Sequence, residues 1–174
     1  MIPSDHFVKF YNEIFKYLEK KGPDELDRYY ERVARRQAFF TLEAFKRDGF
    51  KGMYNYWERI RIEENCDLTH EYGADFYHLR MDKCPSLSKV TDNDAAPCAR
   101  YCDHCPGWVG RVLAWAGYYT VYDIVGRQTP QCDFWVFKTR DEAEAKRDER
   151  IALHGKDVVF TNFAYPAAPR SGSL

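Results

Sequence analysis

The chain has no long apolar run. None of its 174 residues belongs to a stretch approaching the roughly 20 apolar residues that a membrane-spanning helix needs, so we expect no membrane partner. The first residues, Met-Ile-Pro-Ser-Asp-His, contain no basic segment followed by an apolar one, which argues against a signal peptide. These two absences predict a cytoplasmic protein, in which thiols stay reduced.

The chain also lacks an excess of charge of one sign. It has 26 basic and 27 acidic residues, which gives a net charge of −1 at neutral pH. Because nucleic-acid interfaces carry a basic surplus, we expect no nucleic-acid partner. Internal repeats and composition shifts that would mark a domain boundary are absent as well. The sequence therefore predicts one domain over 1–165, followed by a disordered Pro-, Ala- and Ser-rich tail over 166–174.

Aromatic residues, in contrast, are abundant: 13 Tyr, 12 Phe and 4 Trp make up 17% of the chain. Rings in this number favour an aromatic core or a pocket for a small-molecule substrate or ligand. The same rings could instead bury a partner chain. A homo-oligomer or a partner subunit therefore stays open as a second use of these side chains.

The N-terminal half has helical periodicity. Apolar residues recur at three- and four-residue steps up to about Lys21, which predicts a first amphipathic helix. Gly22-Pro23 separates it from a second predicted helix over 24–47, and Gly49 separates that helix from a third over 51–64.

The C-terminal half reads mainly as strands. Strands are predicted over 74–81, 118–125 and 132–138, the last two as an antiparallel hairpin, with helices over 108–116 and 141–154. Helices that come first and strands that come later predict an α+β fold, in which a helical N-terminal half packs on a small antiparallel sheet.

Four of the six cysteines lie close together in the sequence: Cys84, Cys98, Cys102 and Cys105. Thiolates are the ligands that zinc and iron–sulfur clusters prefer. On a helix the last three would share a face, and Cys84 would join them if the 86–97 segment folds back. The pattern predicts a metal site that holds zinc or a [4Fe–4S] cluster. A disulfide or an all-thiol redox site without metal stays open.

Acid, base and nucleophile candidates surround this cluster. Cys102 is a candidate nucleophile, and Asp103, His104 and Asp123 are candidate acid/base groups. His104 is alternatively a metal ligand or an exposed loop residue, and Asp123 stands out because it lies within an apolar strand. Cys132 is either a core residue or part of the same site. Three arginines could hold a substrate carboxylate by bidentate contacts: Arg80, Arg100 and Arg111.

Several of these residues resemble a known pattern. A strand leading into Cys84-Pro85, a central cysteine within 98–105, and a strand and glycine before Cys-Asp-Phe at 132–134 resemble the L-2-amino-thiazoline-4-carboxylic acid hydrolase family. The last part of this pattern, a glycine followed by Cys-Asp-Phe, is also distantly similar to the corresponding part of 4-vinyl reductase domains. The resemblance covers residues 70–140 and implies that Cys84, Cys102 and Cys132 match the family's cysteines, with Cys98 competing for the central place. It further implies hydrolytic opening of a cyclic isothiourea.

Two functions follow as expectations. The first is a hydrolase-like enzyme acting on a C–N bond of a small cyclic amidine or thiazoline, with Cys132 and the three arginines binding the substrate. The second is a non-catalytic zinc- or iron–sulfur-binding small-molecule sensor or accessory subunit. Four thiolates would close the coordination sphere of an ion, whereas a three-ligand site leaves a position for water.

Overall fold

A computed structural model describes residues 3–92, 96–125 and 129–166. Except for Pro166, the predicted tail lies outside these described residues. The model has the predicted α+β architecture, with a helical N-terminal half and an antiparallel sheet of order β1-β2-β4-β3-β5. The elements are α1 (Pro3–Lys21), α2 (Pro23–Glu63), β1 (Asp67–Tyr72), β2 (Phe76–Lys83), α3 (Pro85–Thr91), η1 (Tyr101–Asp103), η2 (Cys105–Val109), α4 (Gly110–Trp115), β3 (Tyr119–Asp123), β4 (Cys132–Phe137), α5 (Arg140–His154), η3 (Lys156–Val158) and β5 (Val159–Thr161).

Glycines set the helix boundaries of the N-terminal half. Gly22, at φ 142°, ends α1, and Pro23 occupies the first position of α2, where its missing N–H costs nothing. Within α2, Gly49 adopts φ 58° and ψ −136°, and the helix bends there. A residue with a β-carbon is strained at such an angle. The break that the sequence predicts between its second and third helices is therefore this kink.

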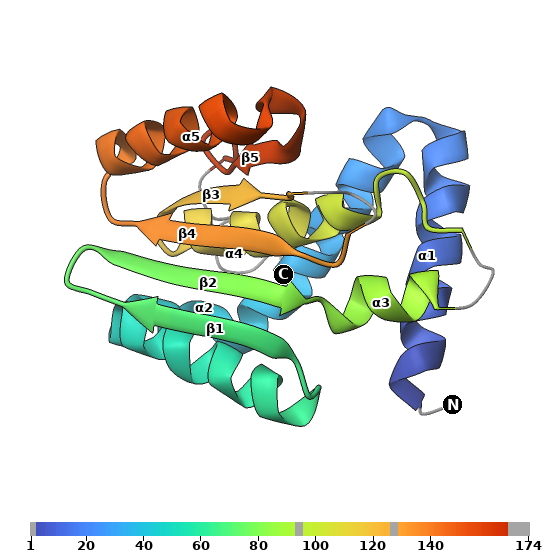
Figure 1. The fold of residues 1–174 in the computed structure, drawn as a ribbon, viewed down its shortest axis with the longest axis horizontal. Helices are drawn as coiled ribbons and strands as arrows, with labels where there is room; N and C mark the ends of the chain where they lie inside the picture. Colours follow the sequence, from blue (N-terminus) through green and yellow to red (C-terminus); the bar gives the residue numbers. More distant parts are fainter. Residues whose placement is uncertain (1–2, 93–95, 126–128, 167–174) are drawn as a thin grey trace.

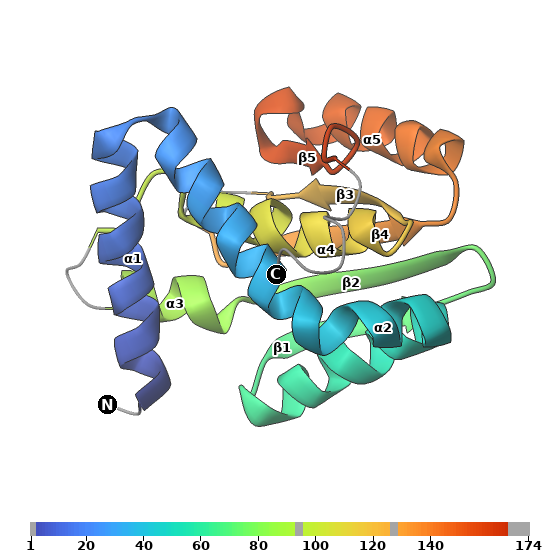
Figure 2. The same ribbon diagram turned by 180° about the vertical axis from the view of Figure 1, so that it is seen from behind.

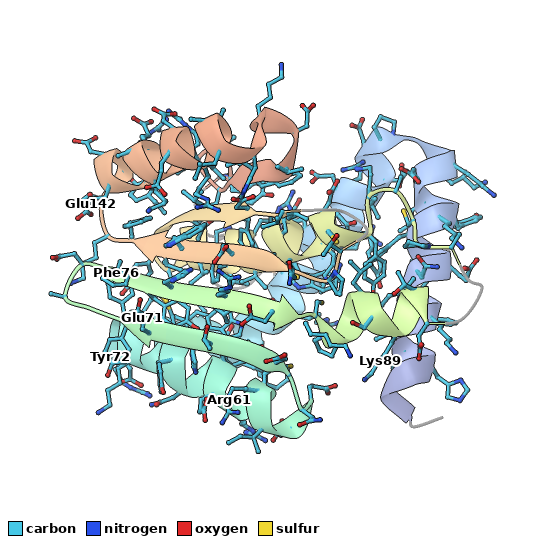
Figure 3. All side chains as sticks on the ribbon, viewed as in Figure 1. Arg61, Glu71, Tyr72, Phe76, Lys89 and Glu142 are labelled. Carbon is cyan, nitrogen blue, oxygen red and sulfur yellow. The ribbon has the colours of Figure 1, made fainter. Side chains whose placement is uncertain are left out.

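The sheet is centred on β2 and β4. Leu79 is opposite Phe134 and Arg80 is opposite Asp133 in this pair, and β3 and β4 form the predicted antiparallel hairpin. Strands β1 and β5 were not predicted, because β1 is largely polar and β5 has only three residues. The β1–β2 hairpin turns between Tyr72 and Phe76, at the end of the sheet remote from α3 (Figure 3).

The two faces of the sheet bury different cores. Helices α2 and α4 lie behind the sheet in Figure 1 and in front of it in Figure 2. The core between these helices and the sheet contains Tyr77, Tyr122 and Phe134. Helix α5 packs over β3 and β4 on the other face, against Val121 and Trp135. Among the described helices, none is long and apolar enough to cross a membrane.

A separate core joins α1, the start of α2 and the cysteine-containing segments. It contains Phe15, Leu26, Tyr30, Leu87, Val90, Cys98 and Tyr101. Helices α1 and α3 lie beyond one end of the sheet, where β2 runs into α3 (Figure 1). This core therefore holds the segment 98–105 against the end of the sheet that carries Cys84 and Cys132.

Candidate functional site

Four cysteines from four different elements line one cavity. Cys84 caps α3, Cys102 lies in η1, Cys105 begins η2 and Cys132 begins β4. The cavity offers about 30 Å³ to the centre of a water-sized guest. One water molecule needs about 10–15 Å³ on the same scale, so a small guest fits. The remaining lining is largely apolar and comes from Leu87, Tyr101, Tyr122, Ile124 and the segment 129–131, together with His104.

Backbone hydrogen bonds bring Cys84 and Cys132 together. Strand β2 leads directly into Cys84, whose N–H donates to the carbonyl oxygen of Pro130 at 2.6 Å. Pro130 lies two residues before Cys132, so this bond attaches the start of β4 to the start of α3. The thiol of Cys84 in turn accepts a hydrogen bond from the N–H of Leu87 at 3.5 Å.

Side-chain contacts position Cys102 and Cys105. The hydroxyl of Tyr101 is hydrogen-bonded to that of Ser86 at 2.6 Å, which joins η1 to α3. The hydroxyl of Tyr30 donates to the carbonyl oxygen of Arg100 at 3.3 Å and joins the same turn to α2. Tyr101 was not singled out from the sequence, although it joins η1 to α3 and lines the cavity.

The thiols of this cavity are hard to ionise. Burial raises the pKa of Cys105 well above its ordinary value, and the neighbouring Cys84, Cys132 and Cys102 raise it further. Burial raises the pKa of Cys132 and of Cys84 too, and two other cavity thiols add to the effect on Cys132. The sulfur atoms that line this cavity thus lie within electrostatic reach of one another. Cys84, Cys105 and Cys132 are neutral at physiological pH unless a cation compensates the thiolate charge.

His104 presents one unprotonated ring nitrogen. Its Nδ1 atom is 2.5 Å from the carbonyl oxygen of Tyr101, and because a carbonyl only accepts, Nδ1 carries the proton. Burial lowers the pKa of His104 to about 4, against the opposing effects of the Tyr101 carbonyl and Asp103. The imidazole is therefore neutral near pH 7, with a lone pair on Nε2. This makes His104 a base or a ligand beside the thiols.

Cys98 of the predicted metal set does not line the cavity. Asn12 binds its backbone N–H, and its thiol donates to Oε2 of Glu19 on α1 at 3.4 Å. Cys132 lines the cavity in its place. Within the part of the chain that the structure describes, no group of three or more His, Cys, Asp or Glu side chains could hold a metal ion.

The three predicted carboxylate-binding arginines lie elsewhere. Arg100 is paired with Asp103 at 2.9 Å. Arg111 is paired with Asp27 at 2.8 Å, donates to the carbonyl of Gly107 and stacks over a tyrosine ring. Arg80 projects from the α5 face of β2, since residues 79 and 81 point to the other face, and it pairs with Asp82 at 2.8 Å. Among the described residues, none that lines the thiol cavity carries a guanidinium group.

The two predicted acidic groups are also turned away. Asp103 is nearly buried and pairs with Arg100 rather than lining the cavity. Asp123 is fully buried on the α5 face of β3, where its Oδ2 atom accepts from Arg150 and His154, each at 2.7 Å. Cys66 is separate as well, since its thiol donates to the carbonyl oxygen of Ile60 at 3.8 Å.

Two residues of α5 were missed by sequence reasoning. Arg150 and His154 lie one turn apart in a helix that was predicted to be charged and solvated, yet both bind Asp123. The available signal was the carboxylate of Asp123 inside an apolar strand, since such a group needs a buried partner.

Neither a family model, nor a curated protein, nor a solved structure matches the chain.

Proposed function

We propose that Cys84, Cys102, Cys105 and Cys132 hold an iron–sulfur cluster, and that the chain is a cluster-binding sensor or accessory subunit. The observation that carries the proposal is the convergence of four thiols from four elements on one enclosed, largely apolar cavity. Buried cysteines that serve only packing have no reason to gather in this way. Four thiols are the complete ligand set of a [4Fe–4S] cluster.

The chemistry of the cavity supports iron over an empty thiol pocket. Burial penalises the thiolate forms of Cys84, Cys105 and Cys132, and neighbouring thiols add to the penalty for the last two. The positive charge of bound iron would offset it. His104, which is neutral, lines the same cavity. The apolar surroundings would keep water away from the iron and set its reduction potential.

A cluster also suits the arrangement better than a single zinc ion does. Zinc draws its ligands to about 2.0–2.3 Å from one point, so a zinc site needs thiols that already converge on a single position. Among the described residues no group of three or more donors is placed to hold a metal ion, and the cavity of about 30 Å³ would have to widen for its four thiols to hold a cluster. When bound, such a cluster supplies one-electron transfer, while the protein holds and shields it.

The test is analysis of the anaerobically purified protein for iron, sulfide and zinc, with an absorption spectrum. We expect about four iron and four sulfide ions per chain and a broad band near ~400 nm. Cys105→Ser should lose both, whereas Cys66→Ser, a cysteine outside the cavity, should keep them. Colourless protein that stays free of iron after anaerobic reconstitution with iron and sulfide would contradict the proposal.

The neutral base at His104 favours a second candidate, the thiol-dependent hydrolysis of a small cyclic amidine. In this reaction Nε2 of His104 takes the proton of a cavity thiol, for which we propose Cys102. Its sulfur attacks the amidine carbon. The ring nitrogen receives the proton from His104, and the ring C–N bond breaks as a second proton passes from the exocyclic nitrogen to the leaving ring nitrogen. Water then displaces the Cys102 sulfur from this carbon and restores the thiol.

Metal-free protein separates the two candidates. If the hydrolase is correct, metal-free chain opens 2-amino-thiazoline-4-carboxylic acid, and Cys102→Ser abolishes turnover while circular dichroism and unfolding stay unchanged. His104→Gln should also abolish turnover. A Cys102→Ser protein with full activity would exclude this mechanism, and lack of turnover by metal-free wild type would leave the cluster proposal as the function of the cavity.

A further inference from the structure

A second cavity lies across β4 from the thiols. It has a volume of about 240 Å³ and is mainly polar, with Arg80, Met81, Gln131, Asp133, Arg150 and His154 in its lining. Gln131 and Cys132 line both cavities. The two spaces are thus separated by little more than the first residues of β4, and the second one has room for a small molecule.

Arg150 is a largely buried cation with donors to spare. Its side chain is 15% exposed and lies over the ring of Trp135, at 5.0 Å from the ring centre. The Nε atom donates to Asp123 at 2.7 Å. Among the described residues, the terminal nitrogens lie 3.4 Å from Nδ1 of His154, 3.8 Å from Glu149 and 4.0 Å from Asp133, so none of them has a short bond. A guanidinium group fixed by one short bond and by stacking is already oriented for a ligand.

Arg80, on β2, lines the same cavity and affects the carboxylate of Asp133. Although burial raises the pKa of Asp133, the hydrogen bond and charge of His78, followed by the charges of Arg150 and Arg80, bring that pKa below its ordinary value. Both guanidinium groups therefore lie within electrostatic reach of one carboxylate. Among the described lining residues, guanidinium N–H donors come from two elements, Arg150 of α5 and Arg80 of β2. Each is held by one short bond to a carboxylate outside the lining, Asp123 or Asp82, which leaves further N–H donors for an oxyanion.

His154 adds a third polar group. Its Nδ1 atom is 2.7 Å from a carboxylate oxygen of Asp123, and because a carboxylate only accepts, Nδ1 carries the proton. No described residue makes a hydrogen bond to Nε2 of His154, which can therefore contact a ligand. Asp123 itself is fully buried behind the cavity, and its Oδ1 atom has no hydrogen-bond partner among the described residues. A buried carboxylate oxygen left without a partner beside a polar cavity is a feature that a bound polar group would explain.

We propose that this cavity binds the oxyanion group, carboxylate or phosphate, of a small molecule, with Arg150 and Arg80 as its charged donors. His154 contributes a further contact through Nε2. The site is independent of what the thiol cavity holds. A ligand bound here would touch Gln131 and Cys132, and would therefore lie directly beside the thiol site.

The test is a titration of the full chain with sodium phosphate and, separately, with sodium succinate, at constant ionic strength. Nuclear magnetic resonance of the Arg150 Nε–H group and of the His154 ring reports binding at the site itself. We expect saturable shifts of both signals with at least one of the two anions, and none with sodium chloride. Saturation by phosphate alone indicates a phosphate-bearing ligand, and saturation by succinate alone indicates a carboxylate.

Matched arginine variants check the assignment. Arg80→Gln removes an exposed side chain and should weaken anion binding about tenfold, since one charge-assisted hydrogen bond is lost. Arg59→Gln, an exposed arginine of α2 outside this cavity, should not change it. Identical shifts with chloride, or equal affinity in the Arg80→Gln protein, would overturn the proposal. Neither outcome bears on iron content, so the cluster proposal is judged separately.

Discussion

The Oδ1 atom of Asn12 accepts a hydrogen bond from the backbone N–H of Cys98 at 2.8 Å. Asn12 is fully buried, and its Nδ2 atom also donates to the carbonyl oxygen of Ala96 at 3.2 Å. The side chain thus clamps the segment before η1 onto α1 and turns the Cys98 thiol toward Glu19. This contact divides the cysteine cluster of the sequence into one structural thiol and three cavity thiols.

The division of the cysteines gives the first prediction. Cys98→Ser should keep the iron content and the visible absorption of the wild type, because serine preserves the backbone clamp and can still donate to Glu19. Cys84→Ser and Cys132→Ser should each lose most of the iron, because their thiols line the cavity. Iron analysis of the three proteins purified side by side decides the matter. Loss of iron in Cys98→Ser with retention in Cys132→Ser would restore the ligand set expected from the sequence.

The fold was largely predictable because its signals are local. The stripe of apolar residues in α1, the glycine at position 49 and the β-branched and aromatic run of β3 each act within a few residues. Strand β1 was not predictable in the same way. Its sequence Asp-Leu-Thr-His-Glu-Tyr contains little β-branched or aromatic density, and pairing with β2 determines its conformation.

The site was predictable only in part because it depends on long-range contacts. The density of cysteines indicated correctly where the thiols gather, and the place of Cys132 on the face of Phe134 was readable from strand alternation. Which cysteine is excluded depends on Asn12, a residue 86 positions away from Cys98 in sequence. The partners of Asp123, on a helix 27 and 31 positions away, were likewise beyond the reach of sequence pattern alone.

A second prediction concerns Gly107, which lies in η2 two residues after the cavity cysteine Cys105. A β-carbon at this position would come within 2.5 Å of the Tyr30 ring, and Tyr30 is itself buried. Gly107→Ala should lower the free energy of unfolding by about 1–3 kcal/mol, the usual cost of overpacking a core. Gly110→Ala is the matched control, since its β-carbon would make only ordinary contacts, the nearest at 3.4 Å. Urea unfolding of both proteins measures the difference, and equal stability would contradict the packing argument.

A third prediction concerns Asn162, which joins the end of the chain to α4 and β3. Its Oδ1 atom accepts from the N–H of Thr120 at 2.9 Å, and its Nδ2 atom donates to the carbonyl oxygens of Gly110 and Tyr118 at 3.1 and 2.9 Å. Asn162→Ala should lower the free energy of unfolding by about 1–3 kcal/mol for each buried group left without a partner.

Asn162→Asp separates the two halves of this network. The carboxylate can still accept from Thr120 but cannot donate to the two carbonyl oxygens, so we expect a loss of stability at neutral pH that is at least as large as in the alanine protein. Thermal unfolding of both proteins is the measurement. Wild-type stability in either protein would show that the hydrogen bonds of Asn162 contribute little.

The last prediction concerns stability in acid. Hydrogen bonds from Arg61 and then from His70 lower the pKa of Glu58 from its ordinary 4.5 to about 2 in the folded protein, against a small opposing effect of burial. A carboxyl group whose pKa is lowered by folding stabilises the folded state above its unfolded pKa. That contribution is lost as the pH falls from about 4.5 to about 2. The free energy of unfolding should therefore decline over this window.

Glu58→Gln should reduce that decline, because glutamine does not titrate. Its neutral amide can still accept from the Nε2–H of His70, which wild-type Glu58 contacts at 3.0 Å, so the fold should be retained. Urea unfolding at a series of pH values between 5 and 2.5 measures the slope for wild type, Glu58→Gln and the control Glu63→Gln, in which an exposed partner of Arg59 is neutralised. A slope in Glu58→Gln as steep as in wild type would mean that the acid sensitivity of the protein arises at other carboxyl groups, because the Glu58 proton would then contribute nothing to the difference between folded and unfolded chain.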